Sequence, residues 1–284
     1  MQVIDAEEMG FCFGVRDALA LARSAPDPHA TTIHGELVHN EAVLAELAAL
    51  GYASSPETTR ALPATSRVLI TAHGISDQER ARLQAAGKQL VDTTCPLVRR
   101  VHDAAQHFAR EGRFVVVLGK PGHVEVRGIV EDLECSVVVA SAADVRTWPV
   151  SSIGIVCQTT LPIRDARELA RRIRGANPDA DVVFTDTVCE PTKRRIAAVE
   201  RLAPRVDAMV VVGGRHSNNT LQLVRLAQRL GVRTFHVQGA ADLQPEALRG
   251  CARVGLTAGT STLDATIAEV RAALAALPEA RRGA

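Results

Sequence analysis

The sequence has little of what marks nucleic-acid-binding, secreted and membrane proteins. Aromatic residues make up only 3% of the 284 residues and the net charge is +1, so neither stacking platforms nor a basic surface for nucleic acid is expected. Residues 1–10 lack the basic segment and apolar run of a signal peptide. The longest apolar stretches, such as 114–118, are far shorter than the roughly 20 residues that span a bilayer. We therefore expect a cytoplasmic protein that binds neither nucleic acid nor a membrane.

Several cofactor motifs are absent too. The sequence has no GxxxxGK[ST] loop and no GxGxxG segment after an apolar run, which disfavours nucleoside triphosphates and dinucleotides as ligands. It also has no CxxC pair, the usual element of a structural zinc site. We therefore expect the six cysteines of a cytoplasmic chain to be reduced thiols, metal ligands or catalysts rather than disulfides.

Short apolar runs rich in Val and Ile alternate with segments of helical periodicity. Continuously apolar strands alternating with helices are typical of parallel sheets covered on both faces, so the sequence predicts an α/β fold. The predicted strands are 68–70, 114–118, 136–139, 153–156, 209–212 and 254–256. The predicted helices are 16–24, 41–50, 76–86, 98–111, 163–174, 196–202, 221–230 and 263–277.

The chain also resembles itself. Three predicted strands run into similar polar loops, at 68–74, 116–123 and 211–217, and a second match joins 153–160 to 254–261. This pattern favours two or three related α/β units with polar residues beyond the carboxyl ends of their strands, where open α/β sheets bind ligands. The order of strand, glycine and helix that all α/β units share explains this internal similarity equally well.

Three cysteines occupy matching positions. Cys12, Cys95 and Cys189 each precede a predicted helix, and the last two share the pattern Asp-Thr-x-Cys. Helix N-termini favour a thiolate, and three thiolates suit an iron–sulfur cluster with one open iron better than a structural zinc. Spacing alone, however, favours three small residues at helix starts. The remaining cysteines border or lie in apolar segments and are expected in the core: Cys135, Cys157 and Cys251.

Polar residues after the strands form a candidate phosphate site. His39, His73 and His123 each follow a strand-like segment and offer positive charge that changes with pH. Glu125 lies two residues after His123, on the same side if this segment is extended, where a carboxylic acid can relay a proton. Neutral side chains at loops and helix starts can bind phosphate oxygens: Thr159, Ser217, Asn218, Asn219 and Ser261.

Together these segments resemble one family, the 4-hydroxy-3-methylbut-2-enyl diphosphate reductases, also called IspH or LytB. The matching stretches occur in family order and cover almost the whole chain. They are GFCFGV at Cys12, ELVHN at His39, TAHGIS at His73, DTTCPLV at Cys95, GHVEV at His123, QTTL at Thr159, VVGGRHSNNT at Ser217 and LTAGTST at Ser261.

The resemblance implies three α/β units, 1–95, 96–188 and 189–284, with small, mostly parallel sheets arranged pseudo-threefold around a central 4Fe-4S cluster. It implies reductive dehydroxylation of the diphosphate to isopentenyl and dimethylallyl diphosphate in the non-mevalonate pathway, with flavodoxin or ferredoxin as electron donor. The cluster ligands fall on Cys12, Cys95 and Cys189, leaving the fourth iron open to substrate, and the proton donor falls on Glu125. Substrate contacts fall on His39, His73, His123, Thr159, Ser217, Asn218, Asn219 and Ser261.

The match is weaker around the third cysteine. Pro191 and Ile196 stand where the family usually has Ala and Gln, and Asn218 replaces a common Ser. These departures leave two alternatives. One is a paralogous iron–sulfur reductase that acts on a related diphosphate, and the other is a non-catalytic iron–sulfur redox sensor. A sensor needs neither Glu125 nor a diphosphate site, so their presence argues against it.

Overall fold

A computed structural model describes residues 1–56, 59 and 61–277. The last residues of the third predicted unit, 278–284, lie outside the described residues. The chain divides into two compact units, which are described separately. One comprises Met1–Phe13, His39–Glu41 and the chain from Glu190 on, and the other comprises Gly14–Val38 and Ala42–Cys189. The three-unit boundaries drawn from the sequence stay a prediction.

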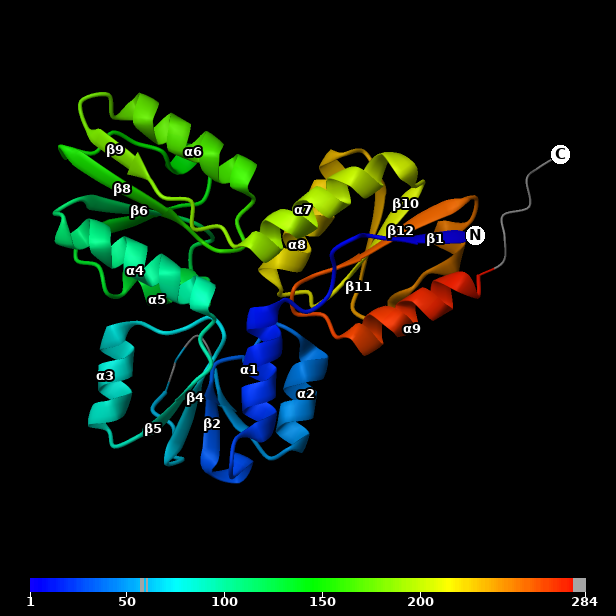
Figure 1. The fold of residues 1–284 in the computed structure, drawn as a ribbon, viewed down its shortest axis with the longest axis horizontal. Helices are drawn as coiled ribbons and strands as arrows, with labels where there is room; N and C mark the ends of the chain where they lie inside the picture. The colour runs from blue at the N-terminus through cyan, green and yellow to red at the C-terminus, as the bar shows by residue number, and fades with distance from the viewer. Residues whose placement is uncertain (57–58, 60, 278–284) are drawn as a thin grey trace. The chain divides into compact units, whose positions relative to one another are not determined.

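The described residues form three four-stranded parallel sheets, which confirms the predicted α/β class (Figure 1). In order across each sheet, the first has β3 (Ala53–Ser55), β2 (Thr31–His34), β4 (Arg67–Ile70) and β5 (Gln89–Asp92). The second has β7 (Ser136–Val139), β6 (Phe114–Leu118), β8 (Ser152–Cys157) and β9 (Asp181–Phe184). The third has β1 (Gln2–Asp5), β12 (Arg253–Ala258), β10 (Ala208–Val212) and β11 (Arg233–Val237).

The helices connect these strands. They are α1 (Phe13–Ser24), α2 (Glu41–Ala49), α3 (Asp77–Ala85), α4 (Pro96–Arg110), α5 (Val124–Val130), α6 (Ile163–Ala176), α7 (Glu190–Leu202), α8 (Asn218–Arg229) and α9 (Asp264–Ala275). Short 3-10 turns lie at Pro28–Ala30, Ala142–Asp144, Ala203–Arg205, Ala240–Asp242 and Pro245–Leu248. No helix in the described part of the chain combines the length and apolar character needed to cross a membrane.

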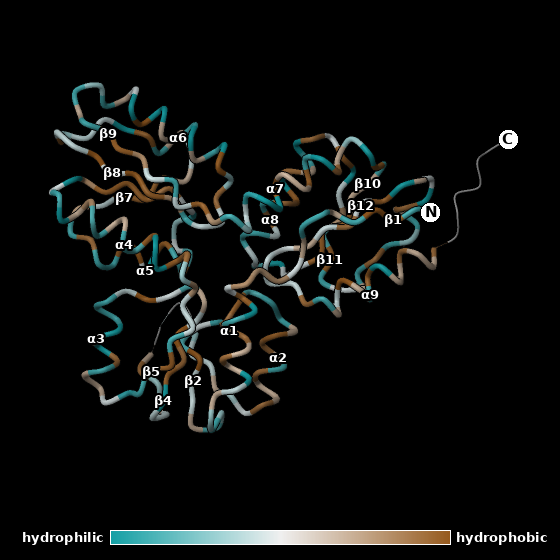
Figure 2. The backbone as a smooth tube through the Cα atoms, in the orientation of Figure 1, coloured by the Kyte–Doolittle hydropathy of each residue, from teal (hydrophilic) through white to brown (hydrophobic). Residues whose placement is uncertain are grey.

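Both faces of the second sheet are buried, as its continuously apolar strands predict. Val116 and Leu118 of β6 pack in the cluster that contains Leu169 of α6. Val115 and Val117, which point the other way along the strand, pack with α4 and α5. In Figure 2 the central strands of this sheet are brown, whereas α3 is largely teal and buries only Leu83.

Apolar packing also accounts for one departure from the family pattern. Ile196 on α7 is buried in a cluster with Leu223 of α8 and with Met209 and Val211 of β10. An apolar side chain therefore suits this position, where water is excluded.

The sequence predicted six strands and eight helices that the structure confirms to within three residues, except that α7 begins six residues before the predicted helix 196–202. It missed β1, β2, β3, β5, β9, β11 and helix α5. Helix α5 also corrects the local prediction at Glu125, because the segment after His123 is helical rather than extended.

Glycine in β8 should be required for packing. A Cβ on Gly154 would lie 2.3 Å from Cγ of Phe108, so we expect Gly154→Ala to lower the free energy of unfolding by about 1–3 kcal/mol through overpacking. Gly175, near the end of α6, has no neighbouring atom within 4 Å of such a Cβ. As a control, Gly175→Ala should raise stability by about 0.5–1 kcal/mol. Urea denaturation of both variants measures the difference, and equal effects would contradict the packing argument.

Candidate functional site

The most deeply buried ionisable side chain among the predicted site residues is that of Glu125. Its side chain is 1% exposed in the first turn of α5. Its two carboxylate oxygens accept hydrogen bonds from the backbone N–H of Thr159 at 2.7 Å and from the Thr159 hydroxyl at 2.9 Å. Because Thr159 follows β8, the loop at the carboxyl end of this strand satisfies a carboxylate that would otherwise be costly to bury.

Two predicted histidines lie together near the beginning of the helix that carries Glu125. His123 is the N-cap of α5, where its Nδ1 accepts the N–H of Glu125 at 3.1 Å. The rings of His73 and His123 meet edge to face with centroids 5.7 Å apart. The unit that contains Gly14–Val38 and Ala42–Cys189 thus gathers two imidazoles and a carboxylate at the carboxyl ends of β4, β6 and β8.

The two Asp-Thr-x-Cys loops adopt the same hydrogen-bond scheme. In each loop the aspartate accepts the N–H two residues on, the threonine hydroxyl donates to the carbonyl at the end of a neighbouring strand, and the cysteine N–H donates to a carbonyl just beyond that strand. For the loop of Asp92–Cys95 the distances are 2.9, 2.6 and 3.1 Å, with Thr94, Ile70 and Ala72 as partners. For the loop of Asp186–Cys189 they are 3.1, 2.7 and 3.0 Å, with Val188, Cys157 and Thr159 as partners.

This scheme fixes the backbone of both cysteines. Burial opposes ionisation of Asp92, but hydrogen bonds from Thr94 and Arg80 outweigh it and hold the pKa of this carboxyl below its ordinary value. Cys95 is the N-cap of α4, and Cys189 directly precedes α7. Both are half-buried thiols. The two loops, which share a sequence pattern, therefore also share one set of hydrogen bonds.

Space beside Cys95 depends on a glycine. A Cβ on Gly14 would lie 2.5 Å from Sγ of Cys95, so only glycine leaves the thiol free of a clash there. Gly14 stands two residues after Cys12 in the first turn of α1.

Cys12 belongs to the other compact unit and is anchored there by a chain of polar contacts. Its N–H donates to the carbonyl of Thr260 at 3.2 Å, and the N–H of Thr260 donates to Oδ1 of Asn219 at 3.0 Å. Nδ2 of Asn219 lies 3.5 Å from the hydroxyl of Thr192 on α7. Cys12 is also a half-buried free thiol and directly precedes α1.

Hydroxyl groups gather in the same unit. Ser217 is the N-cap of α8, and its Oγ accepts the N–H of Thr220. Oγ of Ser261 lies 3.4 Å from Oγ of Ser217 and 3.2 Å from the carbonyl oxygen of His39. Asn218, in the first turn of α8, is buried next to them. Hydroxyl and amide groups at a helix N-terminus suit a phosphate.

The structure therefore distributes the predicted site residues over both units. Glu125, His73, His123, Thr159, Cys95 and Cys189 lie in one, and Cys12, His39, Ser217, Asn218, Asn219 and Ser261 lie in the other. Within the described ranges, no three His, Cys, Asp or Glu side chains form a group that could hold a metal ion. The predicted burial of Cys157 and Cys251 is confirmed, whereas that of Cys135 is wrong, because this residue, just before β7, is exposed.

Sequence reasoning missed the residues that support these groups. Nδ2 of Asn40 donates to the carbonyl of Ser261 at 2.6 Å. The buried Arg195 donates to the carbonyls of Gly10, at 2.5 Å, and Pro191, at 3.0 Å, and so ties the segment before Cys12 to the start of α7. Asn40 directly follows His39 in the sequence. Nothing in the sequence pattern predicted that Asn40 or Arg195 would donate to a backbone carbonyl.

Comparison with known proteins identifies the class to which this fold and these polar groups belong. The family model described as "LytB protein" matches residues 3–275. The chain belongs to the LytB family.

Named relatives match this chain over most of their length. The chain is 34% identical over 278 residues to a 4-hydroxy-3-methylbut-2-enyl diphosphate reductase of Aquifex aeolicus, covering 95% of both chains. It is 36% identical to the protein of the same name from Methylibium petroleiphilum, covering 97% of this chain and 85% of that protein.

Solved structures are similar too. One is the "Structure of (E)-4-Hydroxy-3-methyl-but-2-enyl Diphosphate Reductase, the Terminal Enzyme of the Non-Mevalonate Pathway", with 34% identity, a TM-score of 0.67 and coverage of 97% of this chain and 99% of that one. Another is the "Structure of the E-1-hydroxy-2-methyl-but-2-enyl-4-diphosphate reductase from Plasmodium falciparum", with a TM-score of 0.89 and coverage of 98% of this chain and 89% of that one. At 24% identity it supports the fold alone.

The LytB family uses an iron–sulfur cluster, and the residues present fit such a group. Cys12, Cys95 and Cys189 are half-buried thiols, each directly before a helix, where the N-terminal amides favour a thiolate. Thiolates are the usual protein ligands of iron–sulfur clusters. Glycine at position 14 also lets Sγ of Cys95 take its place without the clash that a Cβ would cause.

The Thr159 hydroxyl should stabilise the buried carboxylate. Thr159→Val keeps the shape of the side chain but removes the donor to Glu125, so we expect a loss of about 1.5–3 kcal/mol in the free energy of unfolding. In the control Thr147→Val, the lost hydroxyl donates to a carbonyl at an exposed position, and the loss should be about 1 kcal/mol or less. Denaturant titrations give both values. Equal losses would show that the Thr159–Glu125 contact is no stronger than a surface hydrogen bond.

Proposed function

We propose that this protein is an iron–sulfur oxidoreductase that converts 4-hydroxy-3-methylbut-2-enyl diphosphate to isopentenyl and dimethylallyl diphosphate. The observation that carries the proposal is the carboxylate of Glu125, buried and oriented by Thr159 beside His123, in a chain of the LytB family. In the overall reaction two electrons and two protons enter, the C–O bond of the allylic alcohol breaks, a C–H bond forms and water leaves.

We assign a 4Fe-4S cluster to Cys12, Cys95 and Cys189. Clusters of this type usually take four cysteines, so three ligands leave one iron without a protein ligand. When bound, the cluster supplies electrons and a Lewis-acidic iron for the substrate hydroxyl. The protein's part is to present three thiolates at helix N-termini, with the backbone of each held by a hydrogen bond from its own N–H.

The remaining site residues hold the substrate and deliver protons. His39, Ser217, Asn218, Asn219 and Ser261 are proposed to bind the diphosphate, and His73, His123 and Thr159 to contact the substrate. Glu125 is proposed to be the proton donor. Its fixed position, with both carboxylate oxygens hydrogen-bonded to Thr159, lets binding of the remote diphosphate place the reacting carbon against it.

Partner and location follow from the chemistry. The overall reaction needs two electrons, so we propose a one-electron carrier protein such as flavodoxin or ferredoxin as the donor. The cytoplasmic location stays a prediction. The redox sensor and the paralogous reductase are less favoured, because the named relatives are reductases of this diphosphate and Ile196 is accounted for by core packing.

Glu125→Gln tests the proton donor. The amide keeps the size of the side chain but has no proton to release, so we expect turnover of 4-hydroxy-3-methylbut-2-enyl diphosphate to fall about 100-fold or more, as for loss of a general acid. An anaerobic assay with a chemical reductant measures it, with substrate affinity and cluster absorbance as controls. Turnover near that of the wild type would remove Glu125 from this role, and an inactive wild-type enzyme with an intact cluster would remove the proposed reaction.

The cluster assignment makes a prediction about metal content. Cys95→Ser should lower bound iron after anaerobic reconstitution to less than about half, because a hydroxyl replaces a thiolate ligand. The matched variant Cys135→Ser changes an exposed cysteine and should keep its iron and brown colour. Iron analysis and absorbance spectra compare the two. If Cys135→Ser lost iron and Cys95→Ser kept it, the ligands would be wrongly assigned.

A further inference from the structure

The first turn of α3 is held by residues that the proposed reaction does not use. Ser76, the N-cap of α3, stands three residues after His73. Because only Gly74 and Ile75 separate the two, the position of the first turn limits where the His73 ring can lie. The contacts at this turn therefore bear on the site.

Asp132, two residues past the end of α5, caps α3. Its carboxylate accepts the N–H of Asp77 at 2.7 Å and that of Gln78 at 3.1 Å. Amides in the first turn of a helix have no partner within the helix, and a carboxylate there also complements the helix dipole. Both contacts run from the end of α5 to the beginning of α3.

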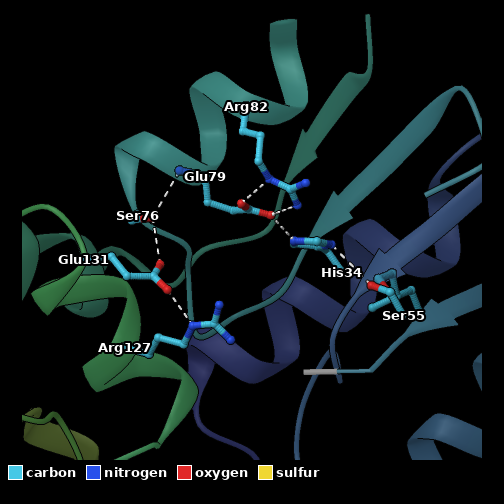
Figure 3. Close-up of polar contacts among 8 residues, drawn as sticks. His34, Ser55, Ser76, Glu79, Arg82, Arg127 and Glu131 are labelled. Carbon is cyan, nitrogen blue, oxygen red and sulfur yellow. Dashed lines mark hydrogen bonds and ion pairs between the residues drawn. The ribbon is translucent and has the colours of Figure 1, made fainter. Parts of the chain in front are cut away.

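Glu131 adds a second set of contacts, drawn in Figure 3. Its Oε2 accepts the hydroxyl of Ser76 at 2.9 Å, and its Oε1 accepts Nε of Arg127 at 2.5 Å. Its backbone carbonyl accepts Nε2 of Gln78 at 2.6 Å. Arg127, one turn earlier on α5, thus orients the carboxylate that reaches Ser76.

Close backbone packing accompanies these bonds. A Cβ on Gly128 of α5 would lie 3.5 Å from the backbone of Ile75, so the two backbones are close enough that one added carbon atom would bring them into van der Waals contact. On its other side the turn is tied to the first sheet, because the carboxylate of Glu79 is hydrogen-bonded to Nε2 of the buried His34 at 2.7 Å (Figure 3). The same carboxylate accepts a hydrogen bond from Nε of Arg82 at 2.7 Å.

We propose that Asp132 and Glu131 are positioning residues, which hold α3 against the end of α5 and thereby place His73 against His123 for substrate binding. Helix α5 carries His123 and Glu125 at its beginning and is followed by the two acidic residues at its end. Helix α5 therefore begins at His123, and the residues at its end hold α3, the helix that follows His73. The proposal rests on the proposed role of His73 in binding substrate.

The geometry separates this role from proton delivery. Glu125 is fixed by Thr159, on a loop that shares no residue with α3. Loss of the Asp132 contacts should therefore displace His73 and leave Glu125 in place. A weakened contact that acts alike on bound substrate and transition state raises KM and leaves kcat unchanged.

The test uses cluster-loaded protein under anaerobic conditions. Asp132→Ala removes both acceptors, Asp132→Asn keeps one oxygen acceptor, and Glu134→Ala changes an exposed acidic residue two positions along the chain as a matched control. Two quantities are measured for each: the rate at which diethyl pyrocarbonate modifies His73, read by peptide mass spectrometry, and the KM and kcat for 4-hydroxy-3-methylbut-2-enyl diphosphate.

For Asp132→Ala we expect faster modification of His73 and a KM raised about tenfold, with kcat within about twofold of the wild type. Asp132→Asn should lie between Asp132→Ala and the wild type, and Glu134→Ala should match the wild type. An unchanged His73 rate, an unchanged KM, or a fall in kcat matched by loss of folded protein would each overturn the proposal. If the wild type does not turn over this diphosphate, the proposed function fails, and the His73 rate in Asp132→Ala still decides whether the contacts place that ring.

Discussion

Burying the carboxylate of Glu125 imposes a requirement that much of the surrounding structure meets. A carboxyl group at 1% exposure needs hydrogen-bond partners for both oxygens, and Thr159 supplies its N–H and its hydroxyl. That loop can do so because it follows β8, a strand buried on both faces at the centre of its sheet. The carbonyl of Thr159 then accepts the N–H of Cys189. The same short loop thereby connects a proposed proton donor to a proposed cluster ligand.

Hydrogen bonds to nearby loops also hold the backbone at the proposed cluster cysteines. The loops that end at Cys95 and Cys189 use aspartate, threonine and cysteine in the same hydrogen-bond roles. Cys12 has no such aspartate and threonine before it, and its backbone is held instead by Thr260 and, through it, by Asn219. Three thiols thus reach equivalent positions before helices by two different sets of contacts.

The sequence predicted central strands better than edge strands, for a physical reason. β6 and β8 are buried on both faces and read as continuous apolar runs. β5, β9 and β11 lie at sheet edges, are partly exposed and contain polar residues, so their patterns resemble loops. β2 is fully buried, but its residues Thr-Thr-Ile-His gave no apolar run. Helix α5 escaped because its seven residues are too few to show a helical period.

By itself the sequence determined the α/β class, every central strand but β2, most helices and which side chains belong to the family motifs, because apolar periodicity and motif spacing are local properties. Only the tertiary structure decided which partner satisfies each buried polar group. Such hydrogen bonds join residues far apart in the chain: Thr159 with Glu125, Asn219 with the loop that holds Cys12, and Asp132 with the first turn of α3. Hydrogen bonds of that kind depend on how strands and helices meet, which local patterns do not encode.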